Sequence, residues 1–269
     1  MTAQQILICL TIVLYLGFIT CVGIYFNRKG SGANTDEYYL GGRRMGPLVV
    51  AMSAEASDMS GWLLMGLPGL AYLSGIAEPF WTAVGLAVGT YFNWLLVARR
   101  LRRYSARLDA ITIPSFFSRR YKDDRHIISC IAAVIIVIFF VPYVASGFKA
   151  IGTLFSTLFD LDYHTAMLAG ATIIIIYTVL GGLAAVATID LIQSVVMSIA
   201  LVSIVSFGVI QAGGWSQVMA NSQEMAGYLN VFQGYNTATG KTGAYGLLAI
   251  VSTLAWGLGY FGMPHILVR

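Results

Sequence analysis

Seven long apolar runs divide the chain, and this pattern constrains its fold more than any other feature. A helix needs about 20 apolar residues to cross the hydrocarbon core of a bilayer. Hydrophobic residues make up 58% of the 269 positions and charged residues only 10%, a composition that does not suit a water-soluble domain. We therefore predict an all-α, polytopic membrane helix bundle of about seven transmembrane helices. The predicted spans lie near 6–26, 47–72, 78–98, 127–157, 164–182, 189–211 and 243–267.

The basic residues indicate how these spans are oriented. The formal net charge is +4, yet the Lys and Arg residues lie in short loops beside apolar runs, so topology explains them better than a nucleic-acid partner does. Only Lys149 and Lys241 lie near the opposite side, and the positive-inside rule places the N-terminus outside and Arg269 in the cytoplasm. The residues on the basic side are Arg28, Lys29, Arg43, Arg44, Arg99, Arg100, Arg102, Arg103, Arg107, Arg119, Arg120, Lys122, Arg125 and Arg269.

The second span carries two carboxylates and a sequence that favours a break in its helix. Glu55 and Asp58 lie at membrane depth, where a charged side chain costs about 2.5–3.5 kcal/mol on insertion scales. Gly66, Pro68 and Gly69 follow them, and unwound backbone at this depth can bind cations through its free carbonyls. The alternative is that the carboxylates form a static polar contact and that the glycines only allow close helix packing. We favour the functional interpretation, because carboxylates inside a membrane are commonly functional.

The seventh span has a second interruption, in which glycines and a proline alternate with large aromatic residues between Trp256 and Pro264. A second broken helix is what an inverted-repeat transporter would supply. The aromatic side chains are equally compatible with a pocket for an apolar ring and with an ordinary interfacial belt.

Three further residues have a structural and a functional interpretation. From the sequence alone, Asp190 at the start of the sixth span is best explained as a helix cap. Arg43 is explained by topology, and Tyr143 beside Pro142 is either a polar group on a cavity or packing at a kink. The sequence contains no nucleophile elbow, P-loop, HExxH or GxGxxG motif, so no residue supports an enzymatic function.

Five segments strongly resemble the sodium/solute symporter family, and within it the bacterial members that transport proline. The longest of them is specific to that family, and the resemblance runs from about the first span to the last residue. The segments are Tyr38–Arg43 (YYLGGR), Ala56–Gly69 (ASDMSGWLLMGLPG), Tyr143–Gly147 (YVASG), Ala187–Asp190 (ATID) and Trp256–Leu267 (WGLGYFGMPHIL).

The resemblance implies roles for individual residues. The carbonyls of Ala56 and Met59 would help to hold the sodium ion, and Asp58 would be the carboxylate on which sodium coupling depends. Arg43 would act in coupling near the cytoplasmic entry, and Asp190 would influence sodium-linked transport. The residues at or near the proline pocket would be Ser60, Trp62, Gly66, Tyr143, Trp256, Tyr260 and Pro264.

Two features depart from the family pattern. Glu55 occupies a position where some relatives carry a small residue, and its role stays open. The resemblance implies about thirteen spans for a family member, among them one N-terminal helix followed by two five-helix repeats of opposite orientation. We therefore expect 1–269 to be a single transmembrane transporter domain that is truncated after the first helix of the second repeat. Because the hydroxyls that complete the family's sodium site come from a later helix, this segment alone is not expected to transport.

The function implied is secondary active transport in the cytoplasmic (inner) membrane, with sodium influx driving the uptake of L-proline by alternating access. The expected partners are sodium, L-proline and the lipid bilayer, with no nucleic acid; the sequence does not indicate an oligomeric state. A sodium symporter for another small organic solute is the nearest alternative. A sensory membrane domain of a signalling protein, or a remnant without function, is a further one.

Overall fold

A computed structural model describes residues 3–29, 35–237 and 239–267 and is almost entirely helical. Clustering of contacts divides the chain into two compact units, Met1–Asp58 with Ser105–Ser194 and Val268–Arg269, and Met59–Tyr104 with Val195–Leu267. Helices α6 and α9 each continue from one unit into the other. Arg269, which the positive-inside rule places in the cytoplasm, lies outside the described part of the chain.

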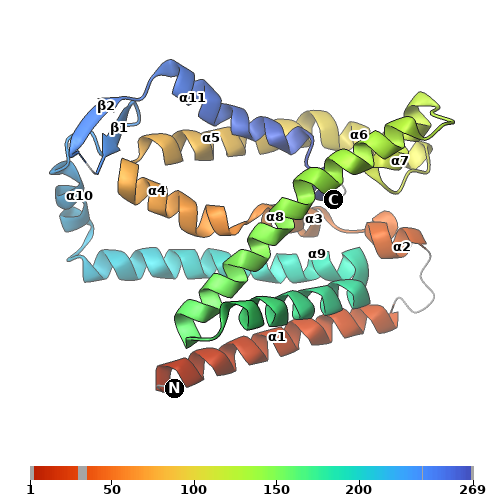
Figure 1. The fold of residues 1–269 in the computed structure, drawn as a ribbon, viewed down its shortest axis with the longest axis horizontal. Helices are drawn as coiled ribbons and strands as arrows, with labels where there is room; N and C mark the ends of the chain where they lie inside the picture. Colours follow the sequence, from red (N-terminus) through yellow and green to blue (C-terminus); the bar gives the residue numbers. More distant parts are fainter. Residues whose placement is uncertain (1–2, 30–34, 238, 268–269) are drawn as a thin grey trace. The chain divides into compact units, whose positions relative to one another are not determined.

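The first unit is built from long helices (Figure 1). Gly23 of α1 lies against Gly181, so the first part of α9 packs beside α1. Helix α7 packs against α8, and its start is capped by Thr112 and Ser115, which exchange side-chain and backbone hydrogen bonds. The elements of this unit are α1 (Ala3–Lys29), α2 (Thr35–Leu40), η1 (Gly41–Arg43), α3 (Pro47–Asp58), α7 (Ile113–Tyr121), α8 (Ile127–Phe159) and the first part of α9 (Tyr163–Gln211).

Helix α9 contains two of the predicted spans, which are separated at Gly182. This glycine has φ +61° inside the helix, and a Cβ built on it would lie 2.8 Å from the carbonyl oxygen of Tyr38. Glycine adopts this backbone conformation without the steric cost that a side chain would add. The Tyr38 hydroxyl donates to the carbonyl oxygen of Val179 at 2.8 Å, which fixes α2 against the kink.

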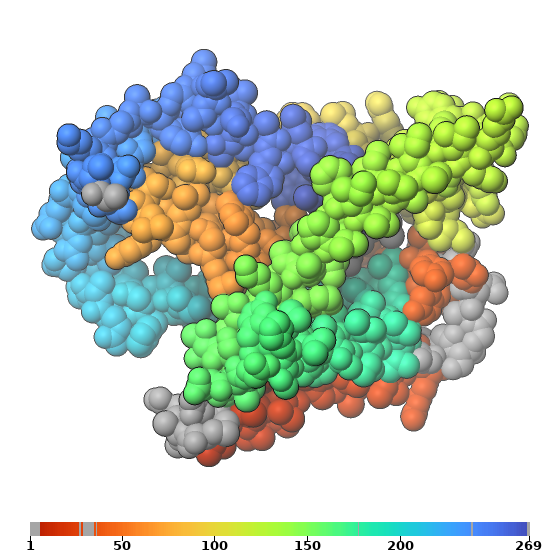
Figure 2. All heavy atoms as spheres, in the orientation of Figure 1, coloured from red at the N-terminus to blue at the C-terminus, as the bar shows by residue number. Residues whose placement is uncertain are grey.

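The second unit is organised around a close contact between α5 and the last helical segments, which run side by side (Figure 1). A short antiparallel hairpin, paired from Gln233 with Ala244 to Asn236 with Lys241, precedes α11. In Figure 2 its atoms adjoin those of α4, which it contacts. The sequence analysis did not predict this hairpin. The elements are η2 (Trp62–Gly66), α4 (Leu67–Ser74), α5 (Ala77–Phe92), η3 (Asn93–Ala98), α6 (Arg99–Arg107), the second part of α9, α10 (Trp215–Gln223), β1 (Gln233–Asn236), β2 (Lys241–Ala244), α11 (Leu247–Leu254), η4 (Ala255–Phe261) and α12 (Pro264–Leu267).

The apolar helices confirm the predicted membrane bundle. No residue in the most apolar window of α8 is buried within the protein, as expected for side chains that contact lipid. Many of the most buried positions are small residues, including Ser53, Ala77 and Ala185, which let membrane helices approach closely. Among the described residues, four helices are long enough to cross a membrane, Ile6–Phe26, Ala77–Arg107, Ile127–Phe159 and Thr178–Gln211, and three shorter apolar segments are Trp62–Ser74, Tyr163–Ile176 and Leu247–Phe261.

Candidate functional site

The second span is broken within its predicted range, but at Met59 and Ser60 and so before Gly66, Pro68 and Gly69. Helix α3 ends at Asp58, Met59 and Ser60 are non-helical, and a π-helix begins at Trp62. The last carbonyl groups of an α-helix have no partner within it and carry partial negative charge. The end of α3, with the carbonyl of Ala56 and the carboxylate of Asp58, therefore presents the kind of groups that attract a cation. The break also coincides with the boundary between the two units.

Asp190 joins α3 to α9 inside the first unit. The Ser53 hydroxyl, which is fully buried, donates to Oδ2 of Asp190 at 2.7 Å, and the Ser57 hydroxyl donates to the same oxygen at 3.4 Å. The Ser194 hydroxyl adds a contact to the Met52 carbonyl at 3.0 Å. Asp190 lies within α9 beyond the kink, so its interpretation as a helix cap is wrong. It is a buried carboxyl group held by hydroxyls of the broken span.

Tyr143 also reaches the end of α3. Its hydroxyl donates to the carbonyl oxygen of Ser57 at 3.0 Å, and Pro142 lies beside it within α8. The bond satisfies one of the last carbonyls of α3. The Tyr143 hydroxyl is thus directed at the broken span, and the cavity considered in the sequence analysis stays a prediction.

The second unit brings the two broken spans together through their tryptophans. The rings of Trp62 and Trp256 lie 4.4 Å apart between centroids at an angle of 36°, and both side chains are partly exposed. A Cβ on Gly66 would lie 3.0 Å from the Trp62 ring, so the glycine makes room for this indole. The Ser60 hydroxyl accepts from the Leu63 backbone N–H at 3.4 Å, at the start of the π-helix.

The seventh span is a 3₁₀-helix where the sequence predicted an interruption. This segment, η4, follows α11 directly, and α12 begins at Pro264. Tyr260 in η4 is 7% exposed, whereas Trp256 is 45% exposed. A partly open aromatic face followed by a buried tyrosine is compatible with one wall of a pocket for a small ring.

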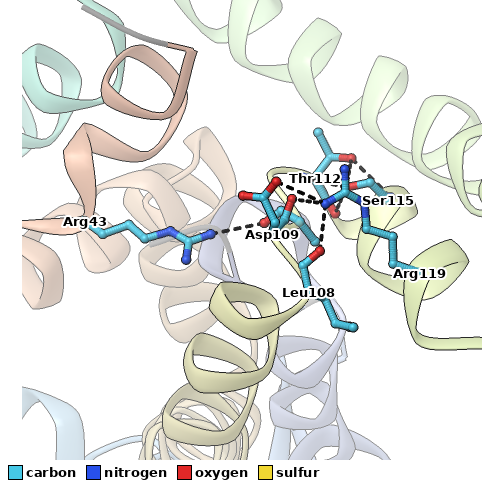
Figure 3. Close-up of polar contacts among 7 residues, drawn as sticks. Arg43, Leu108, Asp109, Thr112, Ser115 and Arg119 are labelled. Atoms are coloured by element: carbon cyan, nitrogen blue, oxygen red, sulfur yellow. Dashed lines mark hydrogen bonds and ion pairs between the residues drawn. The ribbon is translucent and has the colours of Figure 1, made fainter.

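Arg43 is placed against a turn that a second arginine holds (Figure 3). Its guanidinium donates to the carbonyl oxygen of Ala110 at 3.2 Å. Arg119 donates to the carbonyl oxygen of Leu108 at 2.7 Å and to that of Asp109, and it also lies 3.4 Å from the Asp109 carboxylate. Arg43 and Asp109 both have positive φ, so the backbone turns sharply on each side of this contact. The predicted coupling residue therefore links the entry to α3 with the loop before α7.

The predicted site residues divide between the two units, and the structure adds others to them. Arg43, Asp190 and Tyr143 belong to the first unit, and the tryptophans belong to the second. Glu55 is exposed, on the face of α3 opposite to Ser53 and Ser57. The sequence analysis did not select these two serines individually. Their i, i+4 spacing places them on one face of a helix, and that signal was available.

Comparison with known proteins agrees with this description of a multi-pass membrane protein with broken helices. The model of the sodium:solute symporter family matches residues 38–269. Sodium/proline symporters of Staphylococcus aureus strains JH9, NCTC 8325 / PS 47 and COL are each 41% identical over 259 residues, which is 96% of this chain and 48% of the relative. The chain thus spans about half the length of the curated relatives it matches. It belongs to the sodium:solute symporter family.

Proposed function

We propose that the protein acts in secondary active transport, in which sodium influx drives the uptake of L-proline by alternating access. The observation that carries this proposal is the break at Met59 and Ser60, directly after Asp58. Such a break would bring a carboxylate and helix-terminal carbonyls together at membrane depth. Family membership and the names of the relatives support the choice of sodium and proline.

The coupling ion would bind at the end of α3. Ala56 and Met59 would contribute carbonyl oxygens and Asp58 its carboxylate, which suits sodium because it prefers oxygen ligands. We treat sodium as a transported ion and not as a resident cofactor. Among the described residues no group of three or more His, Cys, Asp or Glu could hold a metal. Carbonyl and hydroxyl ligands would have to supply the rest of the site.

The substrate would lie among the aromatic residues of the second and seventh spans. The ring pair formed by Trp62 and Trp256 offers an apolar surface for a pyrrolidine ring. Gly66 would keep that surface accessible, and breaks in both spans would let one group of helices move relative to the other. The residues proposed to contact or shape this pocket are Ser60, Trp62, Gly66, Tyr143, Trp256, Tyr260 and Pro264.

Two residues would transmit sodium binding to the rest of the protein. Asp190 fixes the last turns of α3 through Ser53 and Ser57, so it would determine how the sodium ligands are presented. Arg43 would control the cytoplasmic entry through its contact with Ala110. We place the protein in the cytoplasmic membrane with its N-terminus outside, on the basis of the basic loops. We assign it neither enzymatic activity nor a nucleic-acid partner.

Uptake of labelled proline into vesicles that contain the product of the complete reading frame tests this function. A sodium gradient directed inward should accelerate uptake, and excess proline should abolish the signal while pantothenate or a sugar should not. Competition by one of those solutes, with no effect of proline, would assign the protein to another sodium-coupled substrate. Vesicles with intact protein and no proline flux under either gradient would refute the proposal.

A further inference from the structure

Asn93 carries a buried polar atom that has no partner in the described part of the chain. The residue is 3% exposed, and its side-chain oxygen Oδ1 is buried without a hydrogen bond. Buried polar groups in native proteins are almost always hydrogen-bonded. An exception therefore indicates a bound ligand, a water molecule or a hydrogen-bond partner that is in reach in another conformation. Asn93 also begins the π-helix η3, and π-helical turns inside α-helices are frequent at functional sites.

The position of Asn93 follows from a stripe of small residues on α5. A Cβ on Gly85 would lie 2.8 Å from the Leu254 carbonyl oxygen, and a Cβ on Gly89 would meet the backbone of Gly257. Asn93 is the next residue of this stripe, four positions after Gly89, and residues at this spacing share a helix face. The segment η3 contacts η4 within the second unit. The carboxamide is therefore directed toward the interrupted part of the seventh span, next to the residues of η4 that come after Gly257.

We propose that Asn93 is a substrate-binding residue whose Oδ1 accepts a hydrogen bond from the amine of the transported amino acid. This inference rests on the proposed function. Of the polar groups of an amino acid, the protonated amine carries donors, whereas the carboxylate only accepts. Oδ1 is an acceptor and matches the amine. A sodium ion would need several oxygen ligands at once, and Asn93 contributes one. The buried tyrosine of η4, Tyr260, lies in the same segment that the stripe contacts.

Substitution Asn93→Leu in the purified product of the complete reading frame separates ligand binding from a structural role. Leucine keeps the shape of the side chain and removes the acceptor, so the ligand-free protein should unfold at the same or a higher temperature. The shift in unfolding temperature caused by sodium alone should remain. The further shift caused by proline should be lost, with a proline Kd about 10- to 100-fold higher. Thr82→Val, a buried polar position 1% exposed on the same helix, is the matched control and should bind proline normally.

N-methyl-L-proline provides a second arm, because its amine carries one donor fewer. Methylation should weaken binding more in the unaltered protein than in Asn93→Leu, and this non-additivity reports a direct contact. Lower stability of ligand-free Asn93→Leu would show that Asn93 has a structural partner and would overturn the inference. An unchanged proline Kd, or equal methylation effects in both proteins, would also overturn it. Failure of the unaltered protein to bind proline would instead reject the proposed function itself, before any variant is considered.

Discussion

Replacing Ser53 by alanine should disturb the broken second span far more than replacing Ser57, although both hydroxyls donate to the same carboxyl oxygen. The Ser53 oxygen is 2.7 Å from Oδ2 of Asp190 and is fully buried, whereas the Ser57 oxygen is 3.4 Å away in a partly buried position. Hydrogen bonds between two oxygens are usually about 2.5–3.0 Å long, so the 3.4 Å contact is the weaker one despite the common acceptor. The pair therefore offers a matched comparison one helical turn apart.

The magnitudes follow from these geometries. Loss of a buried hydrogen bond to a carboxyl group costs about 1–3 kcal/mol, because the acceptor stays desolvated. Alanine recovers about 0.5 kcal/mol through its better helix propensity. Ser53→Ala should thus lower the free energy of unfolding by about 0.5–2.5 kcal/mol. Ser57→Ala should change it by less than about 0.5 kcal/mol, since its long hydrogen bond is worth little more than the gain in propensity.

Denaturant unfolding of the purified variants in detergent measures the free energies, and sodium-stimulated proline uptake measures the consequence. Ser53→Ala should also require more sodium for half-maximal stimulation, because the last turns of α3 that hold Ala56 and Asp58 are less fixed. Equal losses in the two variants, or a larger loss for Ser57→Ala, would refute the claim that the short contact to Asp190 organises the broken span.

Three further changes test other contacts. Gly89→Ala should destabilise the protein by about 1–3 kcal/mol in denaturant unfolding, because the new Cβ meets the η4 backbone. The control Gly69→Ala places its Cβ in open space and should not destabilise the protein. Equal effects of the two changes would contradict the close packing of α5 on η4. Arg119→Ala should change the free energy of unfolding by less than about 1 kcal/mol, since the ion pair of Arg119 is largely exposed. It should nevertheless reduce sodium-stimulated proline uptake, because the turn before α7 is held less firmly. Unchanged uptake would contradict this role of Arg119. Asp162 caps the start of α9 by accepting hydrogen bonds from the backbone N–H and the hydroxyl of Thr165, and these bonds hold the pKa of Asp162 below its ordinary value. The stability that the cap adds is therefore fully present above the ordinary pKa and is lost as pH falls through the lowered pKa. Hydrogen exchange at the start of α9 should lose protection over that acidic range, and Asp162→Ala should lack the transition; a transition that persists would assign it to another group.

The helices and their breaks were predictable because they depend on local chemistry. Apolar runs of bilayer length define the spans, and glycines and prolines within the second and seventh spans disfavour regular helix. The exact break in the second span, at Met59 and Ser60, lies before Gly66 and was not predicted. The kink at Gly182 likewise falls at the end of a predicted span. The short hairpin before α11 was not predicted, since only its pairing across a turn distinguishes it from an ordinary loop.

The partners of the site residues were not predictable from local pattern. Asp190 is bonded to Ser53, 137 positions earlier in the chain, and only the packing of α3 on α9 brings them together. Arg43 binds a backbone carbonyl, that of Ala110, and a carbonyl has no side-chain signature in a sequence. The Oδ1 of Asn93 is buried without a hydrogen-bond partner among the described residues, and a sequence does not reveal such burial. The roles of the sodium and proline residues stay predictions that rest on family resemblance and on these contacts.

Reciprocal flux in proteoliposomes containing the product of the complete reading frame tests the central claim, sodium-coupled proline transport, most directly. An inward sodium gradient should concentrate labelled proline, and an inward proline gradient should concentrate labelled sodium, because in a symport cycle the two solutes cross together and either gradient can drive the other. Asp58→Asn should abolish both effects if the carboxylate at the end of α3 binds the ion. Proline accumulation that proceeds equally without a sodium gradient, or sodium entry that ignores proline, would contradict the account.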